Sequence, residues 1–362
     1  MKMLTLKWLV QVLSLPLVKK TGMVVKPRFL NFLITYHCNS RCTMCGIWRR
    51  NHKEKELSAK EILGFFEQNK YFFSDLCHIG ITGGEPVTRS DLVGIIKGIK
   101  KILPNVELGF QTNGLLPEKT EKILRQIISF YPGISLAVSL DGLRKTHDSI
   151  RGIKGAFEKS LTTVKLAKAL GIKRITSGMT INEKNFLEVE AVKQLVEDLG
   201  CEFTCFLPDK ADYFNNEQYD FTFVCRIKDK LAPLLEKNFS HHYFVDNLRL
   251  QLENKRVRRL LCYSGYTSLV LDPYGNIKPC ILRPETFGNL RQKPSLEKML
   301  FNPKALLLKN RLKSCSCWNQ CEVSTSAVVS PWDVLWWFIF YCQKKREFLV
   351  NFYSRLTSTD SL

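Results

Sequence analysis

The sequence predicts an α/β fold, a partial (β/α)6 TIM-like barrel followed by a small C-terminal cysteine-rich module. Two patterns lead to this prediction. Between residues 28 and 208, short apolar runs alternate repeatedly with longer amphipathic segments. After residue 262 the apolar runs shorten and cysteines recur at close spacing. Alternating strands and helices form a parallel sheet with right-handed crossovers, either open or curled into a partial barrel.

Each element of the barrel is expected from its local pattern. Apolar runs between turn residues predict strands at 28–36, 78–82, 107–113, 135–141, 174–181 and 201–207. Amphipathic segments predict helices at 57–69, 91–103, 117–130, 155–170 and 185–199. Ser58 and Ser90 precede the first two helices and are expected to cap them, because a serine hydroxyl accepts a hydrogen bond from the first helical turn.

The chain is expected to have five parts. They are an N-terminal amphipathic leader (1–26), the barrel core (27–208), a helical linker (209–261), the cysteine-rich module (262–325) and an aromatic and basic tail (326–362). In the leader, Leu6, Leu9 and Leu13 share one helical face, which suits a helix packed on the barrel or lying on a membrane. Lys7 interrupts the apolar run that a signal peptide needs, and no window is long enough to span a bilayer.

The amino-acid composition indicates which binding partners and which cellular compartment to expect. Lys and Arg number 54 and Asp and Glu 34, which gives a formal net charge of +20. This charge favours anionic partners, such as a phospholipid surface, nucleic acid or a phosphorylated substrate, or else lysines that decorate exposed helix faces. The 13 cysteines lie at metal-ligand spacing rather than as a disulfide framework. Reduced thiols indicate a cytoplasmic protein, with peripheral contact at the inner face of the membrane as an extension of this prediction.

The tail is the other segment whose sequence suggests contact with a membrane. Ser330 and Pro331 are expected to begin a helix in which Trp332 and Trp336 share a face, followed by basic residues at 344–346. Tryptophans beside a basic cluster suit a membrane interface. The alternative is a helix that packs over the barrel or bridges it to the cysteine-rich module.

The most informative stretch is the loop after the first predicted strand. Cys38, Cys42 and Cys45 stand at C-x3-C-x2-C spacing. Three thiolates hold three corners of a cubane iron–sulfur cluster and leave the fourth iron without a protein ligand. A structural zinc site normally takes four protein ligands, so three favour a cluster with an open iron.

Other polar motifs stand at the carboxyl ends of the following strands. They are Gly83-Gly84-Glu85-Pro86, Thr112-Asn113-Gly114 and Ser139-Leu140-Asp141-Gly142. In parallel β/α folds the chemistry collects at this rim. The three motifs and the cysteine loop are therefore expected to form a single site.

These residues resemble the radical S-adenosylmethionine (radical SAM) enzymes over roughly residues 28–325. The resemblance lies in CNSRCTMC, ITGGEP, QTNG, VSLDG and HDSIRG. It implies that Cys38, Cys42 and Cys45 hold a 4Fe–4S cluster whose fourth iron is chelated by SAM. It also implies that one electron, from a donor such as flavodoxin or ferredoxin, cleaves SAM to methionine and a 5′-deoxyadenosyl radical. That radical would abstract a hydrogen atom from the substrate.

The resemblance also implies the SAM contacts. Gly83 and Gly84 would leave room for the methionine end, and Glu85 would accept from its ammonium group. Arg151 would pair with the methionine carboxylate, which suits a planar guanidinium. The remaining implied contacts are Met44 against the adenine, Ser139 on SAM, and Thr112 and Asn113 on the ribose or the substrate.

A second cysteine set resembles the SPASM/twitch extension of this family. It consists of Cys262 and Cys280, then Cys315, Cys317 and Cys321. The resemblance implies one auxiliary 4Fe–4S cluster on Cys262, Cys280 and Cys321, with Cys317 preferred over Cys315 as the fourth ligand. Four thiolates suit a structural zinc equally well.

The residue after Cys280 differs from one branch of the family. Related enzymes that oxidise a serine or cysteine side chain have an aspartate base at that position, whereas this chain has Ile281. The base is then elsewhere, with Asp272 and Glu285 as candidates near in sequence, or the reaction needs none.

The substrate class stays open between several alternatives. A peptide substrate is typical of SPASM enzymes, although no leader-binding domain is recognisable before the barrel. A carbohydrate, cyclitol or lipid-linked metabolite is indicated by the basic charge and the aromatic tail. RNA modification is favoured by net charge only. A non-enzymatic iron–sulfur scaffold would leave the rim motifs without an explanation.

Overall fold

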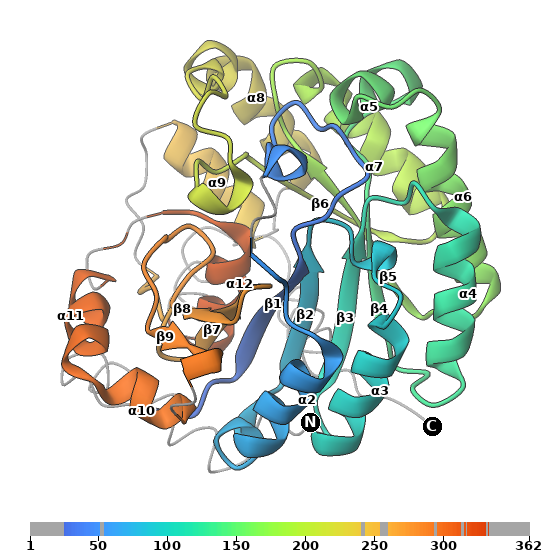
Figure 1. Ribbon diagram of the computed structural model, residues 1–362. Helices are drawn as coiled ribbons and strands as arrows, with labels where there is room; N and C mark the ends of the chain where they lie inside the picture. Colours follow the sequence, from blue (N-terminus) through green and yellow to red (C-terminus); the bar gives the residue numbers. More distant parts are fainter. Residues whose placement is uncertain are drawn as a thin grey trace.

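A computed structural model describes residues 25–50, 54–239, 243–253, 260–292, 295–312, 315, 317–330 and 332. At its centre lies one sheet in the strand order β6-β5-β4-β3-β2-β1-β7-β8-β9 (Figure 1). The run from β6 to β7 is parallel, and β8 and β9 are added by antiparallel pairing. The predicted α/β fold with a parallel sheet is confirmed, and the sheet has edges at β6 and β9 within the described residues.

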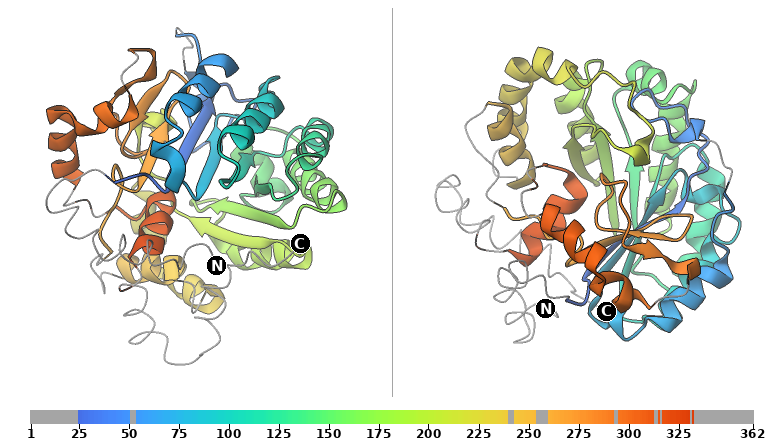
Figure 2. Two further views of the ribbon diagram at one scale, coloured as in Figure 1. Left: turned by 90° about the horizontal axis from the view of Figure 1, so that it is seen from below. Right: turned by 60° about the vertical axis from the view of Figure 1, so that its left-hand side comes forward.

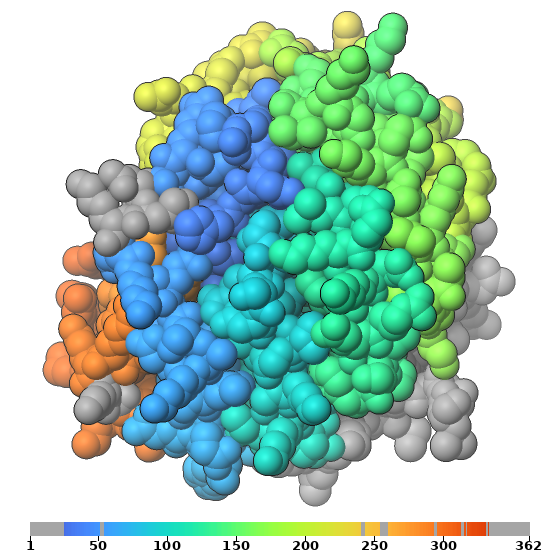
Figure 3. Space-filling model, turned by 45° about the vertical axis from the view of Figure 1, so that its right-hand side comes forward, coloured from blue at the N-terminus to red at the C-terminus, as the bar shows by residue number. Residues whose placement is uncertain are grey.

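The six predicted barrel strands are all present, each within about two residues of its expected bounds. They are β1 (Phe29–Thr35), β2 (His78–Gly83), β3 (Glu107–Thr112), β4 (Ser135–Ser139), β5 (Arg174–Thr180) and β6 (Glu202–Phe206). The helices between them are α2 (Ala59–Gln68), α3 (Leu92–Ile102), α4 (Pro117–Ile128), α5 (Arg144–Arg151), α6 (Ala156–Ala169) and α7 (Val189–Asp198). In the space-filling view, this first half of the chain covers one continuous face (Figure 3).

The two predicted caps have different outcomes. Ser58 caps α2 in a capping box, in which its hydroxyl accepts from the Glu61 N–H and the Glu61 side chain accepts from the Ser58 N–H. Ser90 does not cap α3, so that prediction is wrong. The N-cap residue of α3 is Asp91, whose carboxylate accepts from Arg89 at 2.7 and 2.8 Å instead of from the helix.

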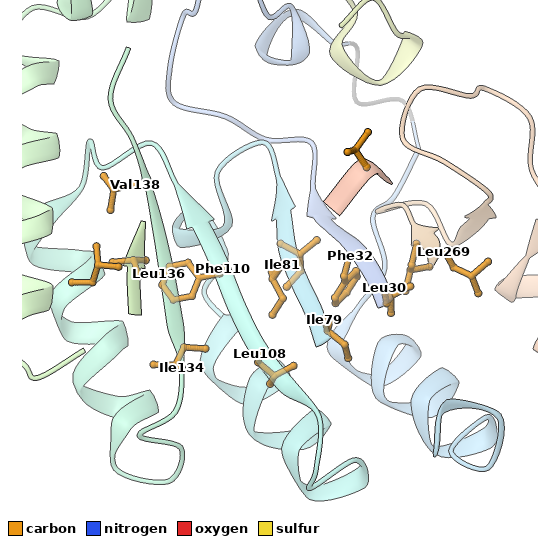
Figure 4. Packing of buried hydrophobic residues seen from close by; sticks show 14 of the residues in the cluster. Leu30, Phe32, Ile79, Ile81, Leu108, Phe110, Ile134, Leu136, Val138 and Leu269 are labelled. Atoms are coloured by element: carbon orange, nitrogen blue, oxygen red, sulfur yellow. The ribbon is translucent and has the colours of Figure 1, made fainter. Parts of the chain in front are cut away.

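The core lies between the sheet and its helices. Register aligns buried side chains in rows across neighbouring strands, for example Leu30 beside Ile79 and Ile81 beside Phe110 (Figure 4). Leu30, Ile79 and Ile81 are at most 2% exposed. Alternate residues of the same strands, such as Thr82 and Gln111, point to the opposite face and line a cavity. The period of two along each strand therefore separates the core from the site.

The described strands of the C-terminal half join the sheet of the barrel. Strand β7 (Ser268–Leu271) pairs in parallel with β1, and β8 (Asn276–Lys278) and β9 (Gly288–Asn289) extend the same sheet (Figure 2). The helices of this half are α8 (Phe223–Phe239), α9 (Tyr243–Leu252), α10 (Leu296–Phe301), α11 (Pro303–Arg311) and α12 (Gln320–Val329). The five-part division of the chain stays a prediction.

Two of the predicted membrane elements cannot be compared with the structure. The leader at 1–24 and the tail beyond residue 332 lie outside the described residues. Among the helices that are described, none combines the length and the apolar character that a bilayer crossing requires.

Candidate active site

The cysteine loop opens onto a cavity at the carboxyl ends of the strands. The cavity has a volume of about 400 Å³, and Cys38, Cys42 and Cys45 all line it. Small or polar residues on the inner face of the sheet form its floor, among them Thr82, Gln111, Ser139, Thr176, Gly178 and Thr204. The structure therefore brings the predicted cysteine loop and the predicted strand-end motifs to one place.

One side of the cysteine loop is held by helix α5, which the sequence analysis did not predict. The Arg41 N–H donates to the Arg151 carbonyl and the Thr43 N–H to the Ile150 carbonyl, each at 2.9 Å. The Ser40 hydroxyl also donates to the Arg151 carbonyl, at 3.3 Å. The last carbonyls of a helix have no partner within the helix. Here the cysteine loop satisfies two of them, and the loop is thereby fixed in position.

The other side of the loop is held by residues that were assigned to the linker. The Gly46 N–H donates to the Phe214 carbonyl at 2.7 Å, and the Asn216 amide donates to the Met44 carbonyl at 3.1 Å. Asn215, whose φ is +49°, donates from its side chain to the Gly46 carbonyl at 3.0 Å. Residues 211–216 thus belong to the site.

Arg151 lies beside the thiols and is held by a buried ion pair. Its Nη2 lies 2.6 Å from Asp141 Oδ2, with the side chains 9% and 0% exposed. Its Nη1 lies 3.5 Å from Cys42 Sγ. Asp141 also accepts from the Thr180 N–H at 2.8 Å. Asp141 therefore positions the guanidinium at the cavity, a role the sequence analysis did not assign to it.

His147 supports this ion pair from behind. Its Nδ1 accepts from the Asp141 N–H at 2.9 Å, and its Nε2 lies 3.4 Å from the Ser160 hydroxyl. Burial, with the nearby Arg151 charge, lowers the pKa of His147 to about 3. The imidazole is therefore neutral and its role is structural.

Gly83 and Gly84 pack directly on the backbone that leads into the cysteine loop. A Cβ at Gly83 would lie 2.3 Å from the Thr35 carbonyl oxygen, and one at Gly84 would lie 2.1 Å from the His37 carbonyl oxygen. Gly83 also has a φ of +124°, which favours glycine. Both glycines line the cavity, and their contact with the methionine end of SAM stays a prediction.

Glu85 is turned away from the cavity lining. It is 1% exposed and accepts from Thr112 Oγ1 at 2.9 Å, the Asn113 N–H at 2.7 Å and the Val87 N–H at 3.1 Å. Burial raises the pKa of Glu85 to about 7, although these donors oppose the rise. The structure thus places Glu85 as a positioning residue for the end of β3 rather than as a wall of the cavity.

The other predicted SAM contacts line the cavity. Met44, Thr112, Asn113 and Ser139 all do so. The Asn113 amide donates to Asn39 Oδ1 at 2.7 Å and lies 3.9 Å from Cys38 Sγ. The contacts of these residues with SAM stay predictions.

The three thiols suit a cluster of several iron atoms. Burial raises the pKa of Cys38 to about 11 and that of Cys45 to about 12. These thiols therefore need a nearby positive charge, such as that of iron, to become thiolates at neutral pH. Among the described residues, no three candidate ligands converge as they would around a single metal ion. A cubane does not require such convergence, because each thiolate binds a different iron.

The cysteine-rich half forms a second pocket of about 240 Å³. Cys262, Cys280, Cys315 and Cys317 line it, with Cys315 Sγ and Cys317 Sγ 3.6 Å apart. Cys321 does not line this pocket but the first cavity. The structure therefore brings together four of the five cysteines in question and separates Cys321, one of the ligands that the resemblance implied.

The first cavity is also lined by residues from the cysteine-rich module and from the start of the linker. Ile281, Asn319 and Gln320 line it, and Asp209 is the one carboxylate among its lining residues in the described chain. Asp272 instead accepts hydrogen bonds from Tyr274 and Asn276 in its own turn.

Comparison with known proteins identifies the family. The sequence profile of the radical SAM superfamily matches residues 32–207. The antilisterial bacteriocin subtilosin biosynthesis protein AlbA of Bacillus subtilis is 28% identical over 271 residues, which cover 73% of this chain and 57% of AlbA. The AdoMet-dependent heme synthase of Methanosarcina barkeri is 24% identical over 309 residues, which cover 76% of this chain and 83% of that protein.

A solved structure shares the fold. Streptococcus suis SuiB bound to precursor peptide SuiA superposes with a TM-score of 0.60 at 16% identity, over 87% of this chain and 73% of SuiB. The matched profile includes the three cysteines of the loop and the motifs at the ends of β2, β3 and β4. Residues 32–207 of the chain are thus identified as a radical SAM domain.

Proposed function

We propose that this protein is an enzyme that binds a 4Fe–4S cluster through Cys38, Cys42 and Cys45 and binds SAM in the adjoining cavity. The observation that carries the proposal is that three thiols and a buried arginine face one cavity at the carboxyl ends of the strands. When bound and reduced, the cluster would supply the electron that cleaves SAM to the 5′-deoxyadenosyl radical. The outcome is abstraction of a hydrogen atom from the substrate.

The residues around the cavity would bind and orient SAM. Arg151, held by Asp141, offers its guanidinium to the methionine carboxylate, since a charge-assisted pair of this kind is strong in a buried site. Gly83 and Gly84 line the cavity and would lie beside the methionine end, while a Cβ at either position would collide with the backbone that leads into the cysteine loop. Met44 and Ser139 remain the proposed contacts to the adenine and to SAM.

For the auxiliary site we propose Cys262, Cys280, Cys315 and Cys317 as the ligands of one 4Fe–4S cluster. Their support is a shared pocket. Cys321, which the resemblance implied as a further ligand, lines the other cavity. It is in the first turn of α12, whereas Cys315 and Cys317 precede that helix. Removal of Cys315 should then cost the auxiliary cluster, whereas removal of Cys321 should not.

For the substrate we propose a peptide. Two relatives support this choice, a bacteriocin biosynthesis protein and an enzyme solved with its precursor peptide. Asn319 and Gln320 line the same cavity, where their amides donate to Asp209 and Thr204. The carbohydrate or lipid-linked metabolite stays the competing prediction, and the heme synthase relative shows that small-molecule chemistry occurs among similar chains.

Anaerobic reconstitution with iron and sulfide, followed by reduction in the presence of SAM, tests the proposal. We expect about eight iron atoms per chain, four for each cubane, and formation of 5′-deoxyadenosine. Cys38→Ala should retain only the auxiliary cluster and form no 5′-deoxyadenosine. Absence of this product from the wild-type chain, or its equal formation by Cys38→Ala, would contradict the proposed function.

Membrane contact through the tail, the flavodoxin or ferredoxin donor and the cytoplasmic location stay predictions. Flotation with liposomes of anionic phospholipid separates the membrane prediction from the others. The full chain should float, and a chain that ends at Val329 should not. Equal recovery of both in the soluble fraction would argue against a membrane-bound tail.

A further inference from the structure

The outer side of the cysteine loop carries one aromatic ring that two arginines contact. The centroid of the Trp48 ring lies 4.4 Å from Arg49 Cζ and 4.9 Å from Arg41 Cζ. Both arginines are exposed, and the tryptophan is partly buried. We call these three residues the arginine–tryptophan patch. None of the three lines the SAM cavity, so the proposed binding of SAM leaves the patch without a role.

The two arginines of the patch have no carboxylate partner among the residues that the structure describes. The Arg41 guanidinium donates to the Ser40 carbonyl at 3.3 Å, and no described carboxylate oxygen lies within 4.0 Å of Arg41 or Arg49. The neighbouring Arg50 differs, because its Nη2 lies 3.4 Å from Asp212 Oδ2. Two like charges beside one ring repel each other. An anionic partner would relieve this repulsion.

The chain that carries the patch is held in position. The Arg41 N–H donates to the Arg151 carbonyl at 2.9 Å, and the Arg49 N–H donates to the Gly46 carbonyl at 2.8 Å. At the end of α5, a Cβ at Gly152 would lie 2.8 Å from Arg41 Cβ, so the two segments pack closely. A guanidinium stacked on an aromatic ring also loses less freedom when it binds a carboxylate. The two charges are therefore prepared for a folded partner.

The patch belongs to the same loop as the proposed cluster ligands. Arg41 directly precedes Cys42, and Trp48 follows Cys45 by three residues. The three thiols of the loop line the cavity, while the segment that contains the loop, coloured deep blue, reaches the surface in the space-filling view (Figure 3). Electron transfer between proteins becomes slower as the separation grows. A carrier that approaches the thiols from outside would therefore meet the patch.

We propose that the arginine–tryptophan patch is the docking surface for an acidic one-electron carrier protein. The inference rests on the proposed function, in which each cleavage of SAM consumes one electron. In the step, the reduced carrier loses one electron and the cluster of the cysteine loop gains it, and no bond of this chain breaks or forms. Carboxylates of the carrier would pair with Arg41 and Arg49, a geometry that guanidinium groups favour. A phospholipid surface is also anionic, but it supplies no electron.

The rate at which a purified carrier drives SAM cleavage tests the proposed surface. Reconstituted protein receives SAM and a limiting amount of a flavodoxin or a ferredoxin, kept reduced photochemically, and 5′-deoxyadenosine is measured over time. In the double variant Arg41→Glu with Arg49→Glu, we expect the initial rate at low salt to fall by about tenfold or more, because the electrostatic attraction is lost. The difference should diminish as salt is added, since ions screen exposed charges. Calorimetric titration with the oxidised carrier should show a matching loss of affinity.

Three controls separate docking from folding. With excess dithionite in place of the carrier, the double glutamate variant should form 5′-deoxyadenosine at the wild-type rate and bind about eight iron atoms per chain. The double variant Arg41→Lys with Arg49→Lys keeps both charges and should retain most of the carrier-driven rate. Lys60→Glu with Lys122→Glu reverses two exposed charges on α2 and α4 and should leave that rate within about twofold of wild type, because charges far from the docking surface are screened.

Two results would overturn the inference. The first is an equal carrier-driven rate in the wild type and the double glutamate variant, and the second is a wild-type chain that accepts electrons from neither carrier. If the first result comes with flotation of the wild type, but not of the variant, on vesicles of anionic phospholipid, the patch is a membrane contact instead. A wild-type chain that forms no 5′-deoxyadenosine even with dithionite would contradict the proposed function itself, and dithionite therefore distinguishes the two failures.

Discussion

The buried pair of Arg151 and Asp141 predicts a large loss of stability when its positive member is removed. The two side chains are 9% and 0% exposed and lie 2.6 Å apart. Arg151→Met keeps most of the side-chain volume, so the change isolates the charge. Removal of one member of a buried pair leaves an uncompensated charge and typically destabilises by about 3–5 kcal/mol. We expect a loss of this size in the free energy of unfolding.

Urea unfolding of the apo-protein under reducing conditions, followed by circular dichroism at pH 7, measures the loss. Arg125→Met is the matched control. Its pair with Glu121 is an exposed contact within one helix, with Arg125 65% exposed, so its removal should change stability by less than about 0.5 kcal/mol. Asp141→Asn in the Arg151→Met background should recover part of the loss, because the buried charge is then gone.

The same pair predicts how the loss depends on pH. Burial raises the pKa of Asp141, and Arg151 opposes the rise. Without Arg151 the pKa of the folded carboxyl rises further above its unfolded value. The destabilisation is then complete above the folded pKa and diminishes as the pH falls toward the unfolded pKa. An Arg151→Met chain within about 1 kcal/mol of wild type at pH 7 would refute this reasoning.

Three further predictions concern residues that line the site or support it. Gly84→Ala should lose the first cluster, with iron falling from about eight to about four per chain, whereas Gly64→Ala, whose Cβ would meet nothing within 4 Å, should keep both clusters. The rise of the Glu85 pKa from 4.5 to about 7 should lower the stability of the apo-protein by about 3 kcal/mol as the pH rises through that range, and Glu85→Gln should abolish this dependence. A flat pH profile in the wild type would contradict it. Asn216→Ala leaves the Met44 carbonyl without its hydrogen-bond donor and should lower the free energy of unfolding by about 1–3 kcal/mol. Urea unfolding measures this loss, and an unchanged midpoint would contradict the prediction.

Most strands of the barrel could be predicted from the local sequence, because each is a short apolar run bounded by turn residues. Helix α5 was missed for a physical reason. It has only 8 residues, and most of them are polar. Short helices are marginal alone and form through tertiary contacts, which here are the bonds from the cysteine loop to its final carbonyls. The predicted cap at Ser90 is wrong because Asp91 is the N-cap residue of α3, and its carboxylate accepts from Arg89 instead of from the helix.

Some residues of the candidate site could also be predicted from local sequence, and others could not. The C-x3-C-x2-C spacing and the glycines after β2 are local in sequence, and both reach the cavity where the strand-end rule puts them. The roles of Asp141, Asp209 and Asn216 have no local signature. Asn216 and Asp209 act through the distant partners Met44 and Asn319, and Asp141 acts through Arg151 at the end of α5.

The sequence by itself indicated the family, predicted an open iron from the three cysteines and predicted the rim on which the candidate site lies. It did so because metal-ligand spacing and strand ends are local properties of the chain. Only the tertiary structure separated Cys321 from Cys315 and Cys317, since the beginning of α12 directs residues four positions apart toward different cavities. Which thiol lies beside which ligand depends on how distant segments pack together, and spacing along the chain does not contain that information.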